Sequence, residues 1–293
     1  LHLALAIAGL VAAVAPAQAQ EVTLKVHHFL PASSFAHTLF IAPWCDKVAK
    51  ESNNRIKCQM YTSMQLGGTP PQLYDQVRDG VADIVWTLPG YTAGRFPSVE
   101  AFELPFMMQS PEATSKALWD YVQTHSQNEF KDVKLIGVHV HGPGLIHSLQ
   151  PVTKLEDLKG MKVRGGSRIV NIMLEQLGAT PVGMPVPAVS EALSKGVISA
   201  TTIPWEVTPA LKVQQLVKNH TGFAGEQGLY TQTFVVAMNK SAYDKLPADL
   251  KKVIDANSGA NTAALFGRAM DEGDKVGLSL AQKAGNKIHM LDV

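Results

Sequence analysis

The first part of the chain alternates strands and helices, and this order constrains the fold more than any other feature. Residues 22–26 alternate apolar and polar side chains, and residues 56–61 and 81–86 are expected to form two further strands. Apolar residues at helical spacing fill residues 35–52, and a second helix is expected over residues 70–80. Strands joined by crossover helices run parallel, so the sequence predicts an α/β fold.

The same alternation returns in the second half of the chain. Strands are expected over residues 135–141, 161–164, 180–184 and 197–203, and Ser167 is placed to cap a helix. The chain without its first segment has about 270 residues, more than one core usually organises, so we expect two lobes.

Two features indicate that the lobes are alike and that the chain crosses between them. Residues 77–83 and 193–199 share a helix end, a glycine and a valine that opens a strand. An apolar strand over residues 229–238 is expected to return to the first lobe, followed by helices over residues 249–283. Chains that cross several times form hinges, and hinged lobes trap ligands in the cleft. We expect lobe I to comprise residues 20–142 and about 230–258, and lobe II residues 143–229 and about 259–293.

The chain begins with an apolar stretch typical of an export signal. Residues 1–19 end in Ala17-Gln18-Ala19, a small-residue cleavage pattern. Their apolar core, residues 3–14, is far shorter than the roughly 20 residues that span a bilayer. We therefore expect a cleaved signal peptide, shortened at its start, rather than a membrane anchor, and export to the periplasm.

Charge and cysteine content limit the partners. The formal net charge of +1, with both signs mixed along the chain, argues against nucleic acid or an anionic membrane surface. Cys45 and Cys58 can bridge a loop of about a dozen residues in an oxidising compartment, worth about 2–3 kcal/mol. We favour this disulfide, and two unpaired buried thiols are the alternative. No further metal ligands accompany them.

Familiar catalytic motifs are absent from the sequence. It lacks a P-loop, a dinucleotide-binding glycine pattern, G-x-S-x-G and H-E-x-x-H. His139, His141 and His147 are the best candidate metal ligands, but no nearby carboxylate completes a site. We therefore expect no metal, and we expect hydrogen-bonded or ligand-facing histidines, with His141 as the candidate ligand contact. His27 and His28 would lie on opposite faces of a strand, so at most one faces a cleft.

Arg164 is the most informative residue. It ends the strand over residues 161–164 and is followed by Gly165-Gly166 and a capped helix. Ligands of parallel α/β sheets bind beyond the carboxyl ends of the strands, and a helix N-terminus adds positive potential there. A guanidinium pairs with a carboxylate through two hydrogen bonds. These features predict a carboxylate socket, with Arg168 as a second candidate. A surface arginine paired with a nearby acid is the alternative.

Five stretches carry a family pattern across nearly all of the chain. They are QLGGTPPQLYDQVRDGVADIVW (65–86), FELPFMM (102–108), LEDLKGMKVR (155–164), LGATPVGMPVPAVSEALSKGVI (177–198) and MNKSAYDKLPADLKKVI (238–254). In this order they resemble the DctP-type solute-binding proteins of the tripartite ATP-independent periplasmic (TRAP) transporters. The resemblance implies two α/β lobes joined by a hinge, a long helix bracing both lobes, no catalysis and no cofactor.

The resemblance also implies the positions of ligand contacts. It carries the arginine that clamps the ligand carboxylate onto Arg164. The remaining contacts are expected from the loops after the first and third strands and from the end of the strand over residues 197–203. These residues are His28, Phe29, Ser34, Thr87, Tyr91, Thr202 and Trp205.

The expected ligand class rests on one difference from sialic-acid-binding members of the family and on three aromatic residues. Sialic-acid-binding members of the family carry a second arginine where this chain has His141-Gly142-Pro143-Gly144, which argues against sialic acid. Phe29, Tyr91 and Trp205 would give the pocket flat apolar walls, which favours a small aromatic or branched monocarboxylate. A 2-oxo acid bridged by an ion at Glu206 is the alternative.

We therefore expect a periplasmic solute-binding protein that captures a small organic acid, with a 2-oxo, 2-hydroxy or aromatic monocarboxylate among the candidates, by closing its lobes. It would be a monomer that delivers the acid to the small and large membrane subunits of a TRAP transporter. The binding protein of an ABC importer or a signalling receptor would share the architecture, and a periplasmic enzyme is a further alternative. Because family members continue past the position of Val293, the C-terminus is expected to be cut short.

Overall fold

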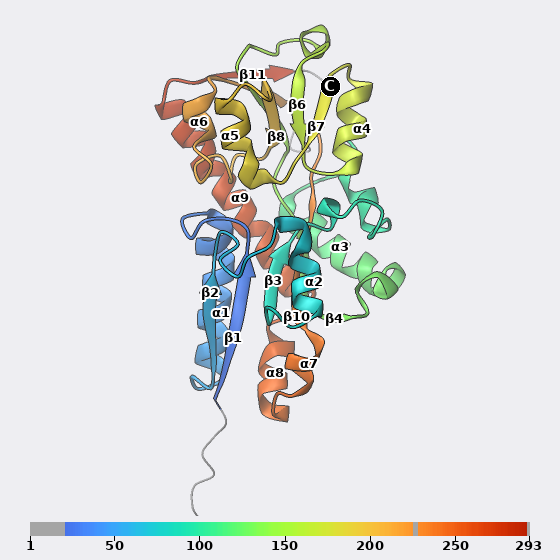
Figure 1. The fold of residues 1–293 in the computed structure, drawn as a ribbon, viewed down its shortest axis with the longest axis vertical. Coiled ribbons are helices and arrows are strands. Elements are labelled where there is room, and N and C mark those ends of the chain that lie inside the picture. The colour runs from blue at the N-terminus through green and yellow to red at the C-terminus, as the bar shows by residue number, and fades with distance from the viewer. Residues whose placement is uncertain (1–20, 225–227, 292–293) are drawn as a thin grey trace, which may run out of the picture.

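The computed structural model describes residues 21–224 and 228–291, which form two α/β lobes with a sheet in each (Figure 1). We call the lobe that holds β1 lobe I and the lobe that holds β6 lobe II. The expected signal peptide lies outside the described residues. Among the helices that the structure describes, none is both long and apolar enough to cross a membrane.

The sheet of lobe I has the strand order β2-β1-β3-β10-β4. β1 runs parallel to β2 and β3, whereas β10 runs antiparallel to β3 and β4. The parallel pairing confirms the α/β prediction. The strands are β1 (Val22–His28), β2 (Ile56–Tyr61), β3 (Ile84–Thr87), β4 (Val133–Val140) and β10 (Thr233–Asn239). The helices beside them are α1 (Ala42–Glu51), α2 (Leu73–Arg78), α3 (Pro111–His125), α7 (Lys240–Asp244) and α8 (Ala248–Ala256).

The sheet of lobe II has the strand order β11-β9-β5-β8-β6-β7. β6 runs parallel to β7 and β8, and β5 runs antiparallel to β8 and β9. The strands are β5 (Leu145–Ser148), β6 (Lys162–Gly165), β7 (Thr180–Gly183), β8 (Ala200–Ile203), β9 (Asn219–Phe223) and β11 (Lys287–Leu291). The helices are α4 (Arg168–Gln176), α5 (Val189–Ser194) and α6 (Val213–Leu216), and the Ser167 hydroxyl accepts the Val170 amide at the start of α4, as predicted.

The chain crosses between the lobes twice before residue 233. It leaves lobe I after β4 and enters β5, and it leaves lobe II after β9 and returns as β10, which lies between β3 and β4. The Gly144 amide donates to the Tyr230 carbonyl over 2.8 Å, and the Leu229 amide donates to the Gly144 carbonyl over 3.2 Å. The two crossing segments therefore form one hydrogen-bonded hinge, and each sheet contains a strand that arrives from the other lobe.

Helix α9 (Ala260–Lys283) connects the lobes a third time, as the long helix that the resemblance implied (Figure 1). Two glycines let it approach its neighbours closely. A Cβ at Gly267 would lie 2.3 Å from the Pro111 carbonyl oxygen in lobe I, and a Cβ at Gly277 would lie 2.1 Å from the Trp205 carbonyl oxygen in lobe II. A side chain at either position would push α9 away from one lobe.

The predicted local repeat has the same hydrogen bonds in both lobes. Gly80 and Gly196 have φ of 78° and 67°, a left-handed conformation that suits glycine. Three residues after each glycine, a backbone amide bonds the neighbouring parallel strand, Asp83 to the Lys25 carbonyl and Ser199 to the Lys162 carbonyl. The valines after the glycines are exposed, and the strands begin later than predicted, at Ile84 and Ala200.

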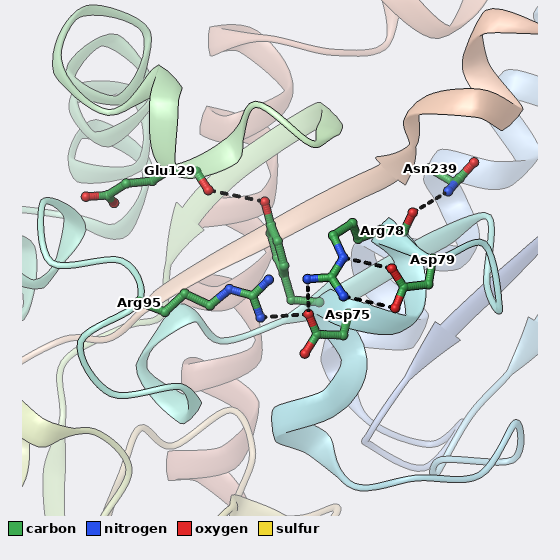
Figure 2. Close-up of polar contacts among 7 residues, drawn as sticks. Asp75, Arg78, Asp79, Arg95, Glu129 and Asn239 are labelled. Carbon is green, nitrogen blue, oxygen red and sulfur yellow. Dashed lines mark hydrogen bonds and ion pairs between the residues drawn. The ribbon is translucent and has the colours of Figure 1, made fainter.

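A cluster of charged residues surrounds the end of α2 (Figure 2). Asp75 accepts from Arg78 over 2.7 Å and from Arg95 over 2.9 Å, and the Arg95 guanidinium lies over the Tyr74 ring. The Asn239 amide donates to the Arg78 carbonyl over 3.0 Å. Since these ion pairs are part-exposed, each contributes little stability. Together they connect α2 to the end of β10 and to the loop that carries Arg95.

A disulfide joins Cys45 of α1 to Cys58 of β2, and the two Cα atoms lie 5.9 Å apart. The indole of Trp44, beside Cys45, donates to the Asn257 carbonyl over 2.8 Å. β2 is the edge strand of the lobe I sheet. The disulfide therefore fixes this edge strand to a helix that is itself anchored to the end of α8.

Candidate ligand-binding site between the lobes

A narrow cavity lies between the lobes at the carboxyl ends of β1, β3, β6 and β8. Phe29 and Trp86 come from lobe I, Arg164 and Ile203 from lobe II, and His141 from a crossing segment. The cavity has about 20 Å³ of room, space for about one water molecule. An organic acid can therefore enter only if the lobes move apart.

Lobe I gives the cavity an aromatic wall. The rings of Phe29 and Trp86 stack with centroids 4.7 Å apart, and Trp86 and Phe234 stack at 4.9 Å. Tyr91 meets Phe29 edge to face at 5.7 Å. The Trp86 indole donates to Nε2 of His139 over 2.9 Å, which fixes the ring. This flat apolar surface suits a planar ligand.

Arg164 is fully buried on lobe II, at the end of β6. Its Nε donates to the Met184 carbonyl over 2.9 Å and its Nη1 to the Thr202 carbonyl over 3.1 Å, while its Nη2 has no partner within the described residues. The Thr202 hydroxyl donates to the Arg164 carbonyl over 3.0 Å. No carboxylate among the described residues forms an ion pair with Arg164. A buried, unpaired cation is costly, so this site favours an anion from outside the chain.

Other polar groups without partners lie beside Arg164. Within the part of the chain that the structure describes, they are the Tyr230 hydroxyl, Nε2 of Gln232 and Nε2 of His141. A Cβ at Gly166 would lie 2.9 Å from Nη2 of Arg164 and 2.4 Å from Oε1 of Gln232, so both side chains meet at this glycine. Hydroxyl, amide and guanidinium donors together are suited to carboxylate oxygens.

His141 is neutral in this position. Burial and, to a smaller extent, the charge of Arg164 lower its pKa to about 4. Nδ1 of His141 donates to the Gly142 carbonyl over 2.5 Å, which leaves Nε2 as an acceptor on the cavity side. The ring can therefore accept a hydrogen bond from a ligand without adding charge.

Three contacts close the lobes over the cavity. The Tyr91 hydroxyl accepts from the Val186 amide over 3.0 Å, and burial raises the pKa of this phenol. The Ser167 hydroxyl donates to Glu103 over 2.5 Å, and Glu103 also accepts from the Thr233 amide over 3.2 Å. Burial raises the pKa of Glu103 to about 7 despite these donors. The third contact is an ion pair between Arg168 and Glu100.

Several residues expected at the site lie elsewhere. Arg168 is half-exposed in its ion pair with Glu100 and does not line the cavity. Nε2 of His28 bonds Nδ1 of His37 over 3.0 Å, and the Ser34 hydroxyl accepts from the His37 amide over 3.4 Å. Phe29 and Trp86 line the cavity, whereas His28 and Thr87 do not. Thr202 holds Arg164 rather than lining the cavity.

Trp205, expected as a wall of the pocket, packs instead in lobe II. Its ring meets the rings of His147 and His220 with centroids 5.0 and 4.8 Å away, under Gly277 of α9. Phe234 and Trp86 form the wall in its place. Trp86 could be found from the sequence as the last aromatic residue before the carboxyl end of a strand. Phe234 could not, because its strand arrives from the other lobe.

Two of the buried histidines, His147 and His220, bond each other in lobe II. Nδ1 of His147 bonds Nδ1 of His220 over 2.7 Å, and Nε2 of His147 bonds the Ile203 carbonyl over 3.0 Å. Nε2 of His220 accepts from the Asn286 amide over 2.9 Å. Among the residues that the structure describes, no three His, Cys, Asp or Glu side chains gather as metal ligands.

A carboxyl pair borders the cavity near the hinge. Glu206 lines the cavity, and Asp274 of α9 accepts from the Glu206 amide over 2.7 Å. Burial raises the pKa of Asp274 to about 8 and, together with the nearby Asp274, raises the pKa of Glu206 well above its ordinary value. Both carboxyls therefore hold a proton more readily than an exposed carboxyl does.

The chain matches the bacterial extracellular solute-binding protein family 7 over residues 26–292. It is also similar to a TRAP solute-binding protein of Rhodoferax ferrireducens T118 solved with copurified benzoate, at 51% identity and a TM-score of 0.91, covering 92% of this chain and 85% of that one. A marine metagenome TRAP solute-binding protein, described as specific for aromatic acid ligands and solved with 3-hydroxybenzoate, has 52% identity and a TM-score of 0.91, covering 93% of this chain and 85% of that one.

A more distant structure is a TRAP periplasmic solute-binding protein from Bordetella bronchiseptica with bound (R)- and (S)-mandelate, at 28% identity and a TM-score of 0.86, covering 92% of this chain and 86% of that one. TRAP solute-binding proteins bind small organic acids and work with TRAP membrane subunits, and the two-lobed fold with its buried arginine fits that role. The chain belongs to the bacterial extracellular solute-binding protein family 7 and is an organic-acid-binding protein of a TRAP transporter.

Proposed function

We propose that this chain binds a small aromatic monocarboxylate between its lobes and delivers it, as a periplasmic monomer without catalytic activity, to the small and large subunits of a TRAP transporter. The observation that carries the proposal is the buried, unpaired Arg164 in the same cavity as the stacked rings of Phe29, Trp86 and Phe234. The guanidinium requires an anion, and the rings favour a flat apolar body attached to it.

In this proposal Arg164 binds the ligand carboxylate with help from the Tyr230 hydroxyl and the Gln232 amide. Phe29 and Tyr91 pack against the ring of the ligand, and Nε2 of His141 accepts a hydrogen bond. Two similar proteins, each sharing about half of the residues of this chain, were solved with benzoate and 3-hydroxybenzoate, which supports the aromatic class.

Binding requires the lobes to open and close. We propose that lobe I comprises residues 20–142 and about 230–258, and lobe II residues 143–229 and about 259–293, supported by the return of β10 to the first sheet and of β11 to the second. The contacts from Tyr91 to Val186 and from Glu103 to Ser167 then break on opening and form on closure. The cavity is too small for the ligand to enter while they hold.

A thermal-shift panel with the chain from residue 20 onward tests the proposal. Benzoate should raise the unfolding midpoint by several degrees, since a ligand at a hundredfold excess over its Kd adds about 2.7 kcal/mol. Benzamide has the same ring without the charge and should give no shift. An equal shift from benzamide would contradict the anion site, and shifts from sugar acids alone would contradict the aromatic class.

A further inference from the structure

The cavity contains a carboxyl group, that of Glu206, which forms no bond with Arg164. Glu206 lines the same cavity, its side chain is almost fully buried, and its Oε2 has no partner within the described residues. Arg164 and Glu206 form no ion pair with each other in the part of the chain that the structure describes. Besides the polar groups around Arg164, the cavity therefore presents a separate carboxyl group to a ligand.

The surface beside these two groups is apolar. Phe29, Trp86 and Phe234 form its stacked aromatic side, and Ile203 and Val207 complete it from lobe II. A ligand that satisfies both polar groups must be flat and apolar in its middle, with a carboxylate at one position and a hydrogen-bonding substituent at another.

The chemistry of the Glu206 carboxyl selects the substituent. Burial and the nearby Asp274 raise its pKa, which favours the protonated form, and a protonated carboxyl offers one donor and one acceptor. A hydroxyl can pair with such a group as donor or as acceptor. A bare ring would leave Oε2 buried without a partner, and a second carboxylate would place a charge beside the pair that Glu206 forms with Asp274.

We propose that Glu206 forms a second polar subsite that selects aromatic monocarboxylates with a hydroxyl on the ring over those with a bare ring. This inference rests on the proposed function, because it takes the carboxylate on Arg164 as given.

Isothermal titration with benzoate, 3-hydroxybenzoate and 4-hydroxybenzoate tests the subsite. One hydroxybenzoate should bind the unmodified chain about ten-fold more tightly than benzoate, a difference of about 1.4 kcal/mol. Glu206→Leu should reduce that ratio to about one while benzoate binding persists. Glu206→Gln, which keeps a donor and an acceptor, should retain most of the ratio.

Glu191→Gln is the matched control, because it makes the same change at an exposed carboxyl of lobe II that pairs with Lys195 and does not line the cavity. Its hydroxybenzoate preference should remain. Equal affinities for benzoate and both hydroxybenzoates in the unmodified chain would overturn the subsite and leave the proposed function intact, as would a preference that survives in Glu206→Leu. If none of the three acids binds, the proposed function itself fails. Circular dichroism of each variant separates loss of binding from loss of folding.

Discussion

Lobe I and lobe II arrange their strands in the same way. β2-β1-β3-β10-β4 in lobe I corresponds to β7-β6-β8-β5-β9 in lobe II, with the same parallel and antiparallel pairings. In each sheet the first antiparallel strand, β10 or β5, arrives through the hinge. The glycine turns at Gly80 and Gly196 lead into equivalent strands.

The lobes differ in what these equivalent strand ends offer. In lobe I, Phe29 follows the last residue of β1 and Trp86 precedes the last residue of β3, and the cavity wall is aromatic. In lobe II, Arg164 precedes the last residue of β6, and the wall carries a buried cation. In the proposed function, neither lobe alone meets both halves of an aromatic acid. One scaffold would then divide recognition, with charge on one lobe and shape on the other, and full affinity would depend on closure.

Removing the buried charge of Arg164 in lobe II should lower ligand affinity more than any other change considered. Arg164→Ala deletes the group that pairs with the ligand carboxylate, and losing one partner of a buried charge pair costs about 2–5 kcal/mol. We expect benzoate affinity to fall by at least about thirtyfold in isothermal titration. Arg268→Ala, which removes an exposed arginine paired with Glu112, should leave affinity unchanged. Similar losses in both variants would contradict the division between the lobes.

Changing the aromatic wall of lobe I should lower ligand affinity less than the loss of Arg164 does, and the size of the loss should depend on the ligand. Phe234→Leu removes a ring that stacks on Trp86 and keeps an apolar side chain. Stacked pairs are worth about 0.5–1.5 kcal/mol beyond their area, so benzoate should bind up to about ten-fold more weakly. Cyclohexanecarboxylate, which cannot stack, should lose less affinity. Equal losses for the two acids would show that the wall supplies only apolar area.

A third prediction concerns Glu103, which bonds both lobes. Its pKa is raised to about 7 in the folded protein, above its ordinary value of 4.5. The unfolded chain therefore releases this proton first, so the stability associated with protonated Glu103 is complete below about pH 4.5 and is lost as pH rises through about 7. Urea unfolding at pH 5 and pH 8 should show a smaller difference in Glu103→Gln than in the unmodified chain. If the stability difference between pH 5 and pH 8 is the same in both proteins, other groups cause it, and Asp274, whose pKa is also raised, is the first candidate.

The smallest expected effect is on stability, and it tests whether the equivalent glycine turns of the two lobes behave alike. Gly80→Ala and Gly196→Ala each force a side chain into the left-handed region, which costs about 1–2 kcal/mol. Because no atom lies within 3.4 Å of either added Cβ, backbone strain is the main cost at both sites. The two variants should lower the free energy of unfolding by similar amounts in urea. A much larger loss of unfolding free energy in one variant would show that the two turns contribute differently to stability.

The sequence could predict those parts of the site that depend on neighbouring residues along the chain. Arg164 ends a parallel strand before a capped helix, and strand ends of this kind form the ligand edge of α/β sheets. Choosing Trp86 over Trp205 requires the path of the chain beyond the strand, because Trp86 lies within β3 whereas Trp205 lies past the end of β8. Gln232 and Tyr230 lie on a segment that reaches Arg164 only after the chain has crossed back, so local patterns give no sign of their role.

The exchange of strands at the hinge also governs how the chain can fold. β10 pairs with β3 and β4, so the sheet of lobe I stays open along two edges until the chain beyond lobe II has been made. Contacts so distant in sequence close large loops and slow folding, and unpaired edges invite aggregation in the interval. The segment 21–140 should therefore not fold as an autonomous domain, and the two lobes should melt in one transition. The connection that lets the lobes move apart in function makes them inseparable in folding.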